Sequence, residues 1–304
     1  MKQVHFVHGG DAYLPELQAY CAYLAQRGHQ AQVHRRADQV PTEADVVWWL
    51  CGRVDRAQAR RLRHCLQVHE YASASVGRWP GVKDRLKRWL HPRPDYRVFQ
   101  SDWLRARMGF DDGVPSCLRD MAVPEAFVQA QATQAPDVDL VYLGEMRRLQ
   151  AFVPTLEAIG QAGLHLLLVG EVPPSLQARL QGVPGLVLQG RVPQSDVPAQ
   201  LLRARAGLNL MPPVLPLREQ TSTKVLEYLA VGLPVVSNPY PWAARCAAQH
   251  PGRLLLRPDL DTPEAWQVLA RSWPAPDPER RHWQGPTWAS LLPGLPVWAA
   301  LGLA

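Results

Sequence analysis

Short apolar segments alternate with helical segments along this chain, and this alternation constrains the fold more than any other feature of the sequence. The apolar runs are four to six residues long and include Val4–Val7, Asp45–Leu50 and Leu140–Leu143. Segments with a helical spacing of apolar residues, such as Leu14–Arg27, stand between them. Strands that alternate with helices predict a doubly wound α/β architecture, in which helices cover a parallel sheet.

The alternation occurs in both halves of the 304 residues, and this length suits two domains with cores of their own. The polar, proline-bearing segment Gln129–Asp139 is the predicted linker. We therefore expect two Rossmann-like domains, at 1–130 and 139–275, and a C-terminal tail at 276–304 that is rich in tryptophan and proline. Within the first domain, the basic segment Arg53–Val68 is predicted to form a helix.

The amino-acid composition indicates which partners the protein binds and in which cellular compartment it resides. The chain has 33 Lys and Arg against 27 Asp and Glu, and its net charge of +6 suggests an anionic partner such as a nucleotide diphosphate, an acidic lipid or a nucleic acid. Solubility alone would explain the charge equally well. Five cysteines without a Cys-x-x-Cys pair indicate reduced thiols, and no signal peptide or membrane span is recognisable. We expect a cytoplasmic protein without a transmembrane segment.

Residues 79–97 begin with a basic, amphipathic segment, Gly81–Trp89, in which apolar side chains stand among lysines and arginines. Such a segment can lie on an anionic membrane surface, which would place the protein peripherally at the inner face of the membrane. It can also contact another polyanion or an acidic acceptor. A third interpretation, which we prefer from the sequence, is that its tryptophans pack into the domain.

The stretch Pro216–Pro239 reads as a polar loop, a helix and a buried strand. Three residues are candidate N-caps of the helix: Thr221, Ser222 and Thr223. The helix is predicted at Lys224–Val231, and Gly232 is its predicted stop. Because a helix N-terminus carries unpaired N–H groups and partial positive charge, this one can receive a phosphate.

Two acidic residues, Glu219 and Glu227, flank the start of this helix. A capping box needs its acid three positions after the cap, whereas Glu227 comes four after Thr223 and five after Ser222. Glu227 is therefore available to accept hydroxyl hydrogens from a ligand. The alternative is an ordinary helix–strand unit with two solvated acids.

Other polar groups follow predicted strands, where open α/β sheets bind ligands. Gly9 and Gly10 end the first strand, although two glycines alone are a weak signal and no G-x-G-x-x-G is present, which argues against a dinucleotide dehydrogenase. The remaining candidates are His69-Glu70 after an apolar run, Arg147-Arg148 after Leu140–Leu143, and the Gly190-Arg191-Val192 turn. For each of these, a structural or solvated role is the alternative.

One motif in this chain resembles a known signature. Glu219-x7-Glu227, followed by Tyr228-Leu229-Ala230-x-Gly232-x-Pro234-Val235-Val236, is similar to the signature of the retaining, nucleotide-sugar-dependent glycosyltransferases of GT-B fold. The Phe-Gly that usually follows the first Glu of that motif is Gln220-Thr221 here. The resemblance covers Leu140–Pro239 well and the first 130 residues more thinly.

The resemblance implies roles for the candidate residues. It places Glu227 on the ribose hydroxyls, Glu219 and its loop against the donor sugar, and His69, paired with Glu70, at the sugar as a catalytic group. The residues implied to contact the nucleotide and its diphosphate are Gly9, Gly10, Arg147, Arg148, Arg191, Val192, Thr221, Ser222, Thr223 and Lys224.

The resemblance also implies a fold and a reaction. The fold is GT-B, with two Rossmann-like domains facing a cleft and a C-terminal segment that crosses back to the first domain. The reaction is transfer of a hexosyl group, with retained configuration, from a nucleotide sugar to a glycan, a lipid-linked intermediate, a small molecule or a nucleic-acid base. No Asp-x-Asp pair ends a predicted strand, so we expect neither an obligatory metal nor a cofactor.

Two alternatives remain open from the sequence. The first is a sugar-nucleotide epimerase of the same fold, which needs no acceptor. The second is a non-catalytic protein that binds nucleotide or nucleic acid, because a fold does not determine a function.

Overall fold

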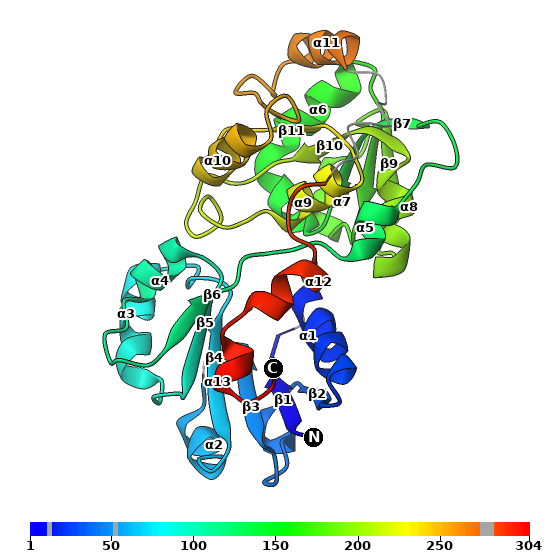
Figure 1. Cartoon of the computed structure of the whole chain (residues 1–304). Helices are drawn as coiled ribbons and strands as arrows, with labels where there is room; N and C mark the ends of the chain where they lie inside the picture. Colours follow the sequence, from blue (N-terminus) through cyan, green and yellow to red (C-terminus); the bar gives the residue numbers. More distant parts are fainter. Residues whose placement is uncertain (11–13, 51–53, 274–282) are drawn as a thin grey trace. The chain divides into compact units, whose positions relative to one another are not determined.

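The computed structural model describes residues 1–10, 14–50, 54–273 and 283–304. The chain forms two compact units, the first made of Met1–Pro124 with Pro286–Ala304 and the second of Glu125–Gly285 (Figure 1). Each unit contains a parallel sheet with six strands among the described residues. The two doubly wound sheets confirm the predicted α/β fold, while the domain limits at 130, 139 and 276 stay predictions.

The strand order of the first sheet is β2-β1-β3-β4-β5-β6, and neighbouring strands pair in parallel. The strands of this unit are β1 (Gln3–Val7), β2 (Gln30–His34), β3 (Val46–Leu50), β4 (Leu66–Tyr71), β5 (Tyr96–Phe99) and β6 (Ser116–Leu118). The helices are α1 (Pro15–Gln26), η1 (Ala37–Gln39), α2 (Arg56–Arg61), α3 (Pro80–Leu90), α4 (Asp102–Met108), α12 (Trp288–Leu291), η5 (Leu292–Gly294) and α13 (Val297–Ala300).

The C-terminal segment is part of the first unit. Thr287 forms a parallel bridge with Val123, and the indole of Trp298 in α13 packs 5.3 Å from that of Trp48 in β3 and 4.9 Å from the ring of Tyr23 in α1, measured between ring centroids. Trp48 and Trp298 are fully buried. The tail therefore supplies part of the aromatic core over β3, as a segment that crosses back to the first domain would.

The predicted helix Arg53–Val68 is wrong over most of its length. Arg53 lies outside the described residues, α2 ends at Arg61, and the chain from Leu66 onward is strand β4. The basic residues suggested one continuous helix, but β4 fills the position between β3 and β5. Its polar side chains are accommodated in the interior; the amide of Gln67, for example, donates to the carbonyl oxygens of Ala59 and Leu62 (2.8 and 3.2 Å).

The strand order of the second sheet is β12-β11-β10-β7-β8-β9, again in parallel. Its strands are β7 (Val138–Leu143), β8 (Leu166–Val169), β9 (Leu186–Gly190), β10 (Ala204–Asn209), β11 (Val235–Ser237) and β12 (Leu254–Leu256). The helices of this unit are α5 (Glu125–Gln129), η2 (Met146–Phe152), α6 (Val153–Gln161), α7 (Pro174–Arg179), η3 (Gln194–Asp196), α8 (Val197–Leu201), α9 (Thr223–Ala230), α10 (Pro241–Gln249) and α11 (Pro263–Ser272).

Tyr228 holds α9 against the centre of the second sheet. Its hydroxyl accepts a hydrogen bond from the backbone N–H of Leu143 (2.7 Å) and donates one to the carbonyl oxygen of Leu208 (3.3 Å). Gly207 in β10 makes room for the ring, since a Cβ at this position would lie 2.3 Å from a ring carbon of Tyr228. Helix α9 is therefore positioned by contacts to both β7 and β10.

The structure of α3 (Pro80–Leu90) shows that our preferred interpretation of segment 79–97, in which its tryptophans pack into the domain, is wrong. Trp79 and Trp89 do not pack into the unit, because their side chains are 66% and 78% exposed. In the described part of the chain, no helix is both long and apolar enough to cross a membrane.

Candidate functional site

The second sheet changes direction between β7 and β10. From β7 the chain builds β8 and β9 on one side, and then returns to add β10, β11 and β12 on the other. Loops that leave the carboxyl ends of two such strands diverge and leave room for a ligand. Here the two loops are the turn after β7, which contains Gly144, and the segment from β10 to the N-terminus of α9.

The two loops meet at Lys224, in the first turn of α9. The Nζ atom of Lys224 lies 3.6 Å from the centroid of the Tyr142 ring in β7. A Cβ at Gly144 would lie 3.8 Å from the same nitrogen. Gly144 has a φ of 111°, a conformation that glycine adopts without strain. The structure thus brings the β7 turn and the start of α9 together around one ammonium group.

Lys224 is buried, and within the described residues its ammonium has no hydrogen-bond partner. Burial, and then the positive charge of Arg148, lower the pKa of Lys224 well below its usual value. An unpartnered charge in the interior is unfavourable unless a counter-charge offsets it. An anionic ligand at this position would supply that counter-charge.

The two adjacent arginines have different surroundings. Arg148 in η2 is half-buried, and its charge acts on both Lys224 and Tyr142. The side chain of Arg147 is exposed, and its backbone N–H donates to the carboxylate of Glu145 (3.1 Å). The structure therefore brings the charge of Arg148 close to Lys224, and within its described part it shows no such interaction between Arg147 and Lys224.

The N-terminus of α9 has an N-cap whose hydroxyl is engaged elsewhere. Ser222 is the N-cap residue, between Thr221 and Thr223, and its hydroxyl donates to Oδ1 of Asn209 (3.1 Å) rather than accepting from the helix. The amide of Asn209 in turn donates to Ser237 (2.8 Å). The network orients the N-cap, and among the described residues the hydroxyl of Ser222 does not cap the positive end of the helix, in keeping with an anion site. Asn209 was not among the predicted residues, although a polar residue at the end of a strand was a signal.

Glu227 lies one turn further along α9, three residues after Lys224 and hence on the same side of the helix. Its carboxylate is buried and accepts a long hydrogen bond from the amide of Gln194 in η3 (3.4 Å). Burial raises the pKa of Glu227 to about 7, against the smaller opposing effects of Gln194 and Lys224. Gln194 is a further residue that the sequence did not reveal.

The loop after β9 carries the predicted Arg191 and Val192. Arg191 is exposed, and its guanidinium lies 3.5 Å from the carboxylate of Glu171. Val192 is half-buried and precedes the helix η3 that supplies Gln194 to Glu227. The loop therefore reaches the α9 site through Gln194, while the contacts of Arg191 and Val192 with a base stay a prediction.

Glu219 is held by two arginines. Its carboxylate lies 3.4 Å from the guanidinium of Arg245 in α10 and 3.6 Å from that of Arg218. The Glu219 side chain is 13% exposed. The arginines fix this carboxylate in the loop before α9. Arg245 could not be foreseen from the sequence because it lies 26 residues along the chain.

In the first unit, Gly9 and Gly10 follow β1 and are exposed. The strand order places the change of direction between β1 and β3, so the two glycines stand at the corresponding point of the first sheet. The loop after β3 contains residues 51–53, which lie outside the described residues.

His69 lies inside the central strand β4 and is fully buried. Its ring packs edge-on against those of His91 and Tyr71, with centroids 5.9 and 6.4 Å away. Among the described residues, neither ring nitrogen has a hydrogen-bond partner. Burial, followed by the charges of His91 and Arg97, lowers the pKa of His69 to about 3. The imidazole is therefore neutral at physiological pH.

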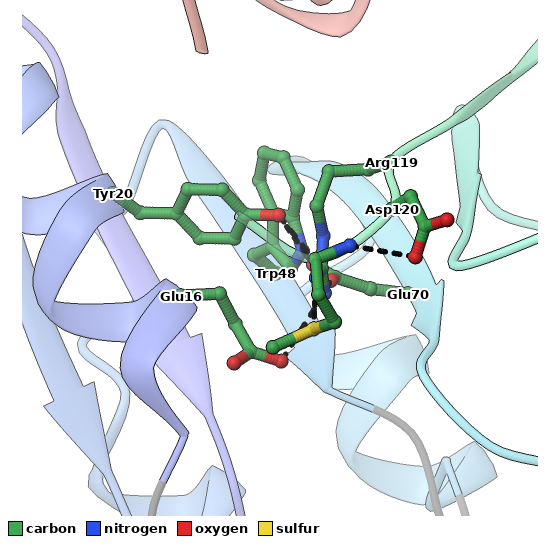
Figure 2. Close-up of polar contacts among 7 residues, drawn as sticks. Glu16, Tyr20, Trp48, Glu70, Arg119 and Asp120 are labelled. Carbon is green, nitrogen blue, oxygen red and sulfur yellow. Dashed lines mark hydrogen bonds and ion pairs between the residues drawn. The ribbon is translucent and has the colours of Figure 1, made fainter. Parts of the chain in front are cut away.

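Glu70 points to the opposite face of the sheet from His69, because side chains alternate along a strand. Figure 2 shows it in a buried cluster with Glu16, Tyr20, Trp48 and Arg119. Arg119 forms ion pairs with both Glu70 and Glu16, and the indole N–H of Trp48 donates to Glu70 (2.7 Å).

Burial raises the pKa of Glu70, while the charge of Arg119 opposes the rise. The structure thus does not bring His69 and Glu70 together as a pair, and it gives Glu70 the contacts of a buried ion pair. Their catalytic roles stay predictions.

No group of three or more His, Cys, Asp or Glu side chains that could hold a metal ion occurs among the described residues. Lys224 and Arg148 are two cationic side chains of the α9 site.

Comparisons with known proteins agree with this arrangement. Residues 137–269 match the family model described as "Glycosyl transferases group 1". No curated protein sequence matches the chain.

Among solved structures, AviGT4, a glycosyltransferase involved in avilamycin A biosynthesis, is 16% identical, with 92% of this chain and 91% of that chain covered and a TM-score of 0.58. HepE of Anabaena, in complex with UDP and glucose, is 10% identical, with 96% and 93% covered and a TM-score of 0.66. Sucrose-phosphate synthase of Thermosynechococcus elongatus is 14% identical, with 100% and 97% covered and a TM-score of 0.63. At these identities the similarity establishes a shared fold.

The two parallel-sheet units, together with the family match, define this protein as a glycosyltransferase of GT-B fold. The match to the glycosyl transferases group 1 covers residues 137–269, which lie within the second unit. The resemblance to GT-B glycosyltransferases read from Glu219, Glu227 and the residues after them is thereby confirmed, while retention of configuration stays a prediction.

Proposed function

We propose that the protein transfers a hexosyl group from a nucleotide-sugar donor to an acceptor, and that the donor diphosphate binds at the N-terminus of α9. The observation that carries this proposal is the buried ammonium of Lys224, which has no hydrogen-bond partner among the described residues and lies beside the uncapped start of the helix. A diphosphate would offset the charge of Lys224 and accept hydrogen bonds from the first N–H groups of α9.

The same helix offers a partner for the ribose. Glu227 follows Lys224 by three residues, so both side chains leave α9 on one side. Burial raises the pKa of Glu227 to about 7. Hydrogen bonds donated by the hydroxyl groups of a ribose would favour the charged form of this carboxylate. The hydrogen bond from Gln194 to Glu227 is long (3.4 Å), so a ribose hydroxyl could donate a stronger one to this carboxylate.

Departure of the sugar places additional negative charge on the diphosphate, and groups that stabilise this charge accelerate the reaction. In our proposal Lys224, Arg148 and the helix dipole stabilise it, without an obligatory metal. Activity should then persist in EDTA. Loss of activity on chelation, with recovery on addition of a divalent cation, would contradict this part of the proposal.

We further propose that the configuration of the sugar is retained, as the family resemblance implies. The leaving phosphate would take the proton of the attacking acceptor on the same face. His69 would orient the sugar, since a histidine with a pKa of about 3 is too weak a base to take that proton efficiently at neutral pH. An NMR spectrum of the product that shows inversion relative to the donor would contradict retention.

The decisive experiment is a screen of nucleotide sugars for release of nucleoside diphosphate, with and without a panel of glycans, lipid-linked saccharides, small molecules and nucleic-acid bases. UDP-glucose belongs in the first set, because the HepE structure holds UDP and glucose. Acceptor-dependent release supports the transferase. Conversion of the donor to an isomer without acceptor would identify an epimerase, and binding without any release would identify a non-catalytic nucleotide-binding protein.

A further inference from the structure

Helix α3 in the first unit exposes an apolar surface to solvent. Figure 1 shows α3 beside α4 at the edge of the unit that carries β5 and β6. Five large apolar side chains of this helix and its N-cap are between 47% and 78% exposed. We call this set the α3 stripe, and its members are Trp79, Val82, Leu86, Trp89 and Leu90.

The stripe is one continuous face of the helix. At 3.6 residues per turn, its four helical positions, Val82, Leu86, Trp89 and Leu90, fall within an arc of ~100°, and Trp79 is the N-cap at the start of the helix. The opposite face is held to the unit by Asp84, the buried residue of α3, whose carboxylate accepts from the backbone N–H of Ser75 (2.9 Å) and pairs with Arg107 of α4 (2.7 Å). An ordinary amphipathic helix buries its apolar face, whereas α3 is attached through a charged residue and presents its apolar face outward.

Basic side chains border the stripe on both sides. Lys83 and Lys87 follow one edge of the arc and Arg85 follows the other. Lys83 and Arg85 are exposed, as is Arg78, which precedes the helix. The stripe therefore meets solvent as a band of apolar side chains with a basic side chain on each side.

A hollow of about 660 Å³ lies where α3 meets α4. Three arginines line it, Arg85, Arg88 and Arg107, together with the indoles of Trp79 and Trp103. Guanidinium groups bind phosphate oxygens, and tryptophan side chains favour the boundary between water and hydrocarbon. The hollow thus combines groups suited to a phosphate with groups suited to a lipid interface, directly beside the stripe.

Trp79 carries backbone strain as well as exposed apolar surface. Among the described non-glycine residues, it is the one with a positive φ, 60°. This conformation is unfavourable for a bulky side chain. The residue is the N-cap of α3, and its carbonyl oxygen accepts from the backbone N–H groups of Val82 and Lys83 while most of the indole is in solvent.

We propose that α3 attaches the protein to the surface of an anionic membrane. The α3 stripe would enter the boundary between head groups and acyl chains, the basic side chains would contact the head groups, and the arginine-lined hollow would receive a lipid phosphate. Exposed apolar area draws the helix into the interface, and positive charge on both sides selects anionic lipid. Charge complementarity favours a membrane over a second protein surface, since the described residues of α3 that border the apolar face are the cations Lys83, Lys87 and Arg85.

The test is flotation of the full-length protein with vesicles of phosphatidylcholine, and with vesicles in which about one third of the lipid is phosphatidylglycerol. We expect binding to the anionic vesicles, at least tenfold weaker binding to the neutral ones, and a decrease with added salt. Lys83→Gln and Arg85→Gln should each lower the partition coefficient about fivefold, the equivalent of about 1 kcal/mol per basic residue. Leu86→Ser combined with Trp89→Ser should lower it by more than tenfold.

Matched controls come from the second unit. Val268 in α11 is 56% exposed and Arg271 in the same helix is exposed, so Val268→Ser and Arg271→Gln remove the same kinds of group away from α3. Both controls should bind vesicles like the wild type. The α3 variants change exposed side chains and should keep the wild-type melting temperature.

Several results would overturn the proposal. The wild type could bind neutral and anionic vesicles equally, or it could bind neither. The α3 variants could also bind anionic vesicles as strongly as the wild type. Self-association that disappears in the Leu86→Ser, Trp89→Ser variant, without vesicle binding, would assign the stripe to a contact between proteins. Binding of inorganic phosphate at the arginines, without vesicle binding, would assign the hollow to a free anion.

Discussion

The ammonium of Lys224 lies 3.6 Å from the centroid of the Tyr142 ring, and within the described residues it makes no hydrogen bond. The face of an aromatic ring attracts a cation without neutralising it. The side chain is thus held in place while its charge remains available to a ligand. A carboxylate in the position of the Tyr142 ring would hold the lysine more strongly but would compete with a phosphate.

The first prediction concerns the ribose contact. Glu227→Gln should weaken binding of a nucleoside diphosphate by about 1.5–3 kcal/mol, the scale of a charge-assisted hydrogen bond. The variant should remain folded, because glutamine fills the same space. Isothermal calorimetry provides the measurement, and an unchanged affinity would remove Glu227 from the ribose site.

The second prediction is that Glu227 makes the stability of the protein depend on pH. The pKa of Glu227 is about 7 in the folded protein and 4.5 in its ordinary state, so between these values the folded protein holds a proton that the unfolded chain has lost. Stability from this group therefore falls as pH rises from 4.5 to 7, and the destabilisation is fully present above pH 7.

Glu227→Gln removes this titration. Relative to the wild type, its free energy of unfolding in urea should increase between pH 5 and pH 8 by on the order of 2 kcal/mol. A difference between variant and wild type that is the same at both pH values would show that the carboxylate does not titrate in this range.

The third prediction separates a structural ion pair from a catalytic one. Arg119→Met would leave Glu70 and Glu16 buried without their cation, and should destabilise the protein by about 3–5 kcal/mol in urea denaturation. Arg105→Met is the matched control, because its pair with Asp102 lies on the surface and should be worth less than about 1 kcal/mol. Equal losses for the two variants would contradict the structural role of the buried cluster.

The fourth prediction concerns His69. His69→Ala should lower kcat by ~10²-fold, on the order of 3 kcal/mol, and leave the affinity for nucleoside diphosphate nearly unchanged. Because its pKa is about 3, His69 should contribute no inflection to the pH–rate profile between pH 5 and pH 8. An inflection in that range that disappears in His69→Ala would make the histidine an acid–base group.

Much of the fold follows from local sequence patterns, and what was missed depends on contacts between distant residues. Helix α9 and the stop at Gly232, whose φ is 89°, follow from capping and glycine signals within a few residues. By contrast, β4 is a strand because β3 and β5 lie on either side of it, and the basic residues before it suggested a helix.

In the candidate site, too, local motifs could be predicted from the sequence and contacts between distant residues could not. Lys224, Glu227 and Glu219 were identified from one short motif, whereas Gln194 and Arg245 contact that motif from other parts of the chain. Such partners have no signature of their own in a single sequence. The outward orientation of the apolar face of α3 was missed for a related reason, because amphipathic spacing does not tell which face the unit buries.

The most direct test of the central claim is a pair of calorimetric titrations, with a nucleoside diphosphate and with the corresponding nucleoside, on the wild type, on Lys224→Met and on the control Arg271→Gln. If Lys224 binds the donor diphosphate, Lys224→Met lowers the affinity for the diphosphate at least tenfold and leaves that for the nucleoside within about twofold, since a lost charge-assisted hydrogen bond is worth about 1.5–3 kcal/mol. The control should change neither affinity. Equal losses for both ligands on Lys224→Met, or no loss for either, would contradict a diphosphate site at the N-terminus of α9.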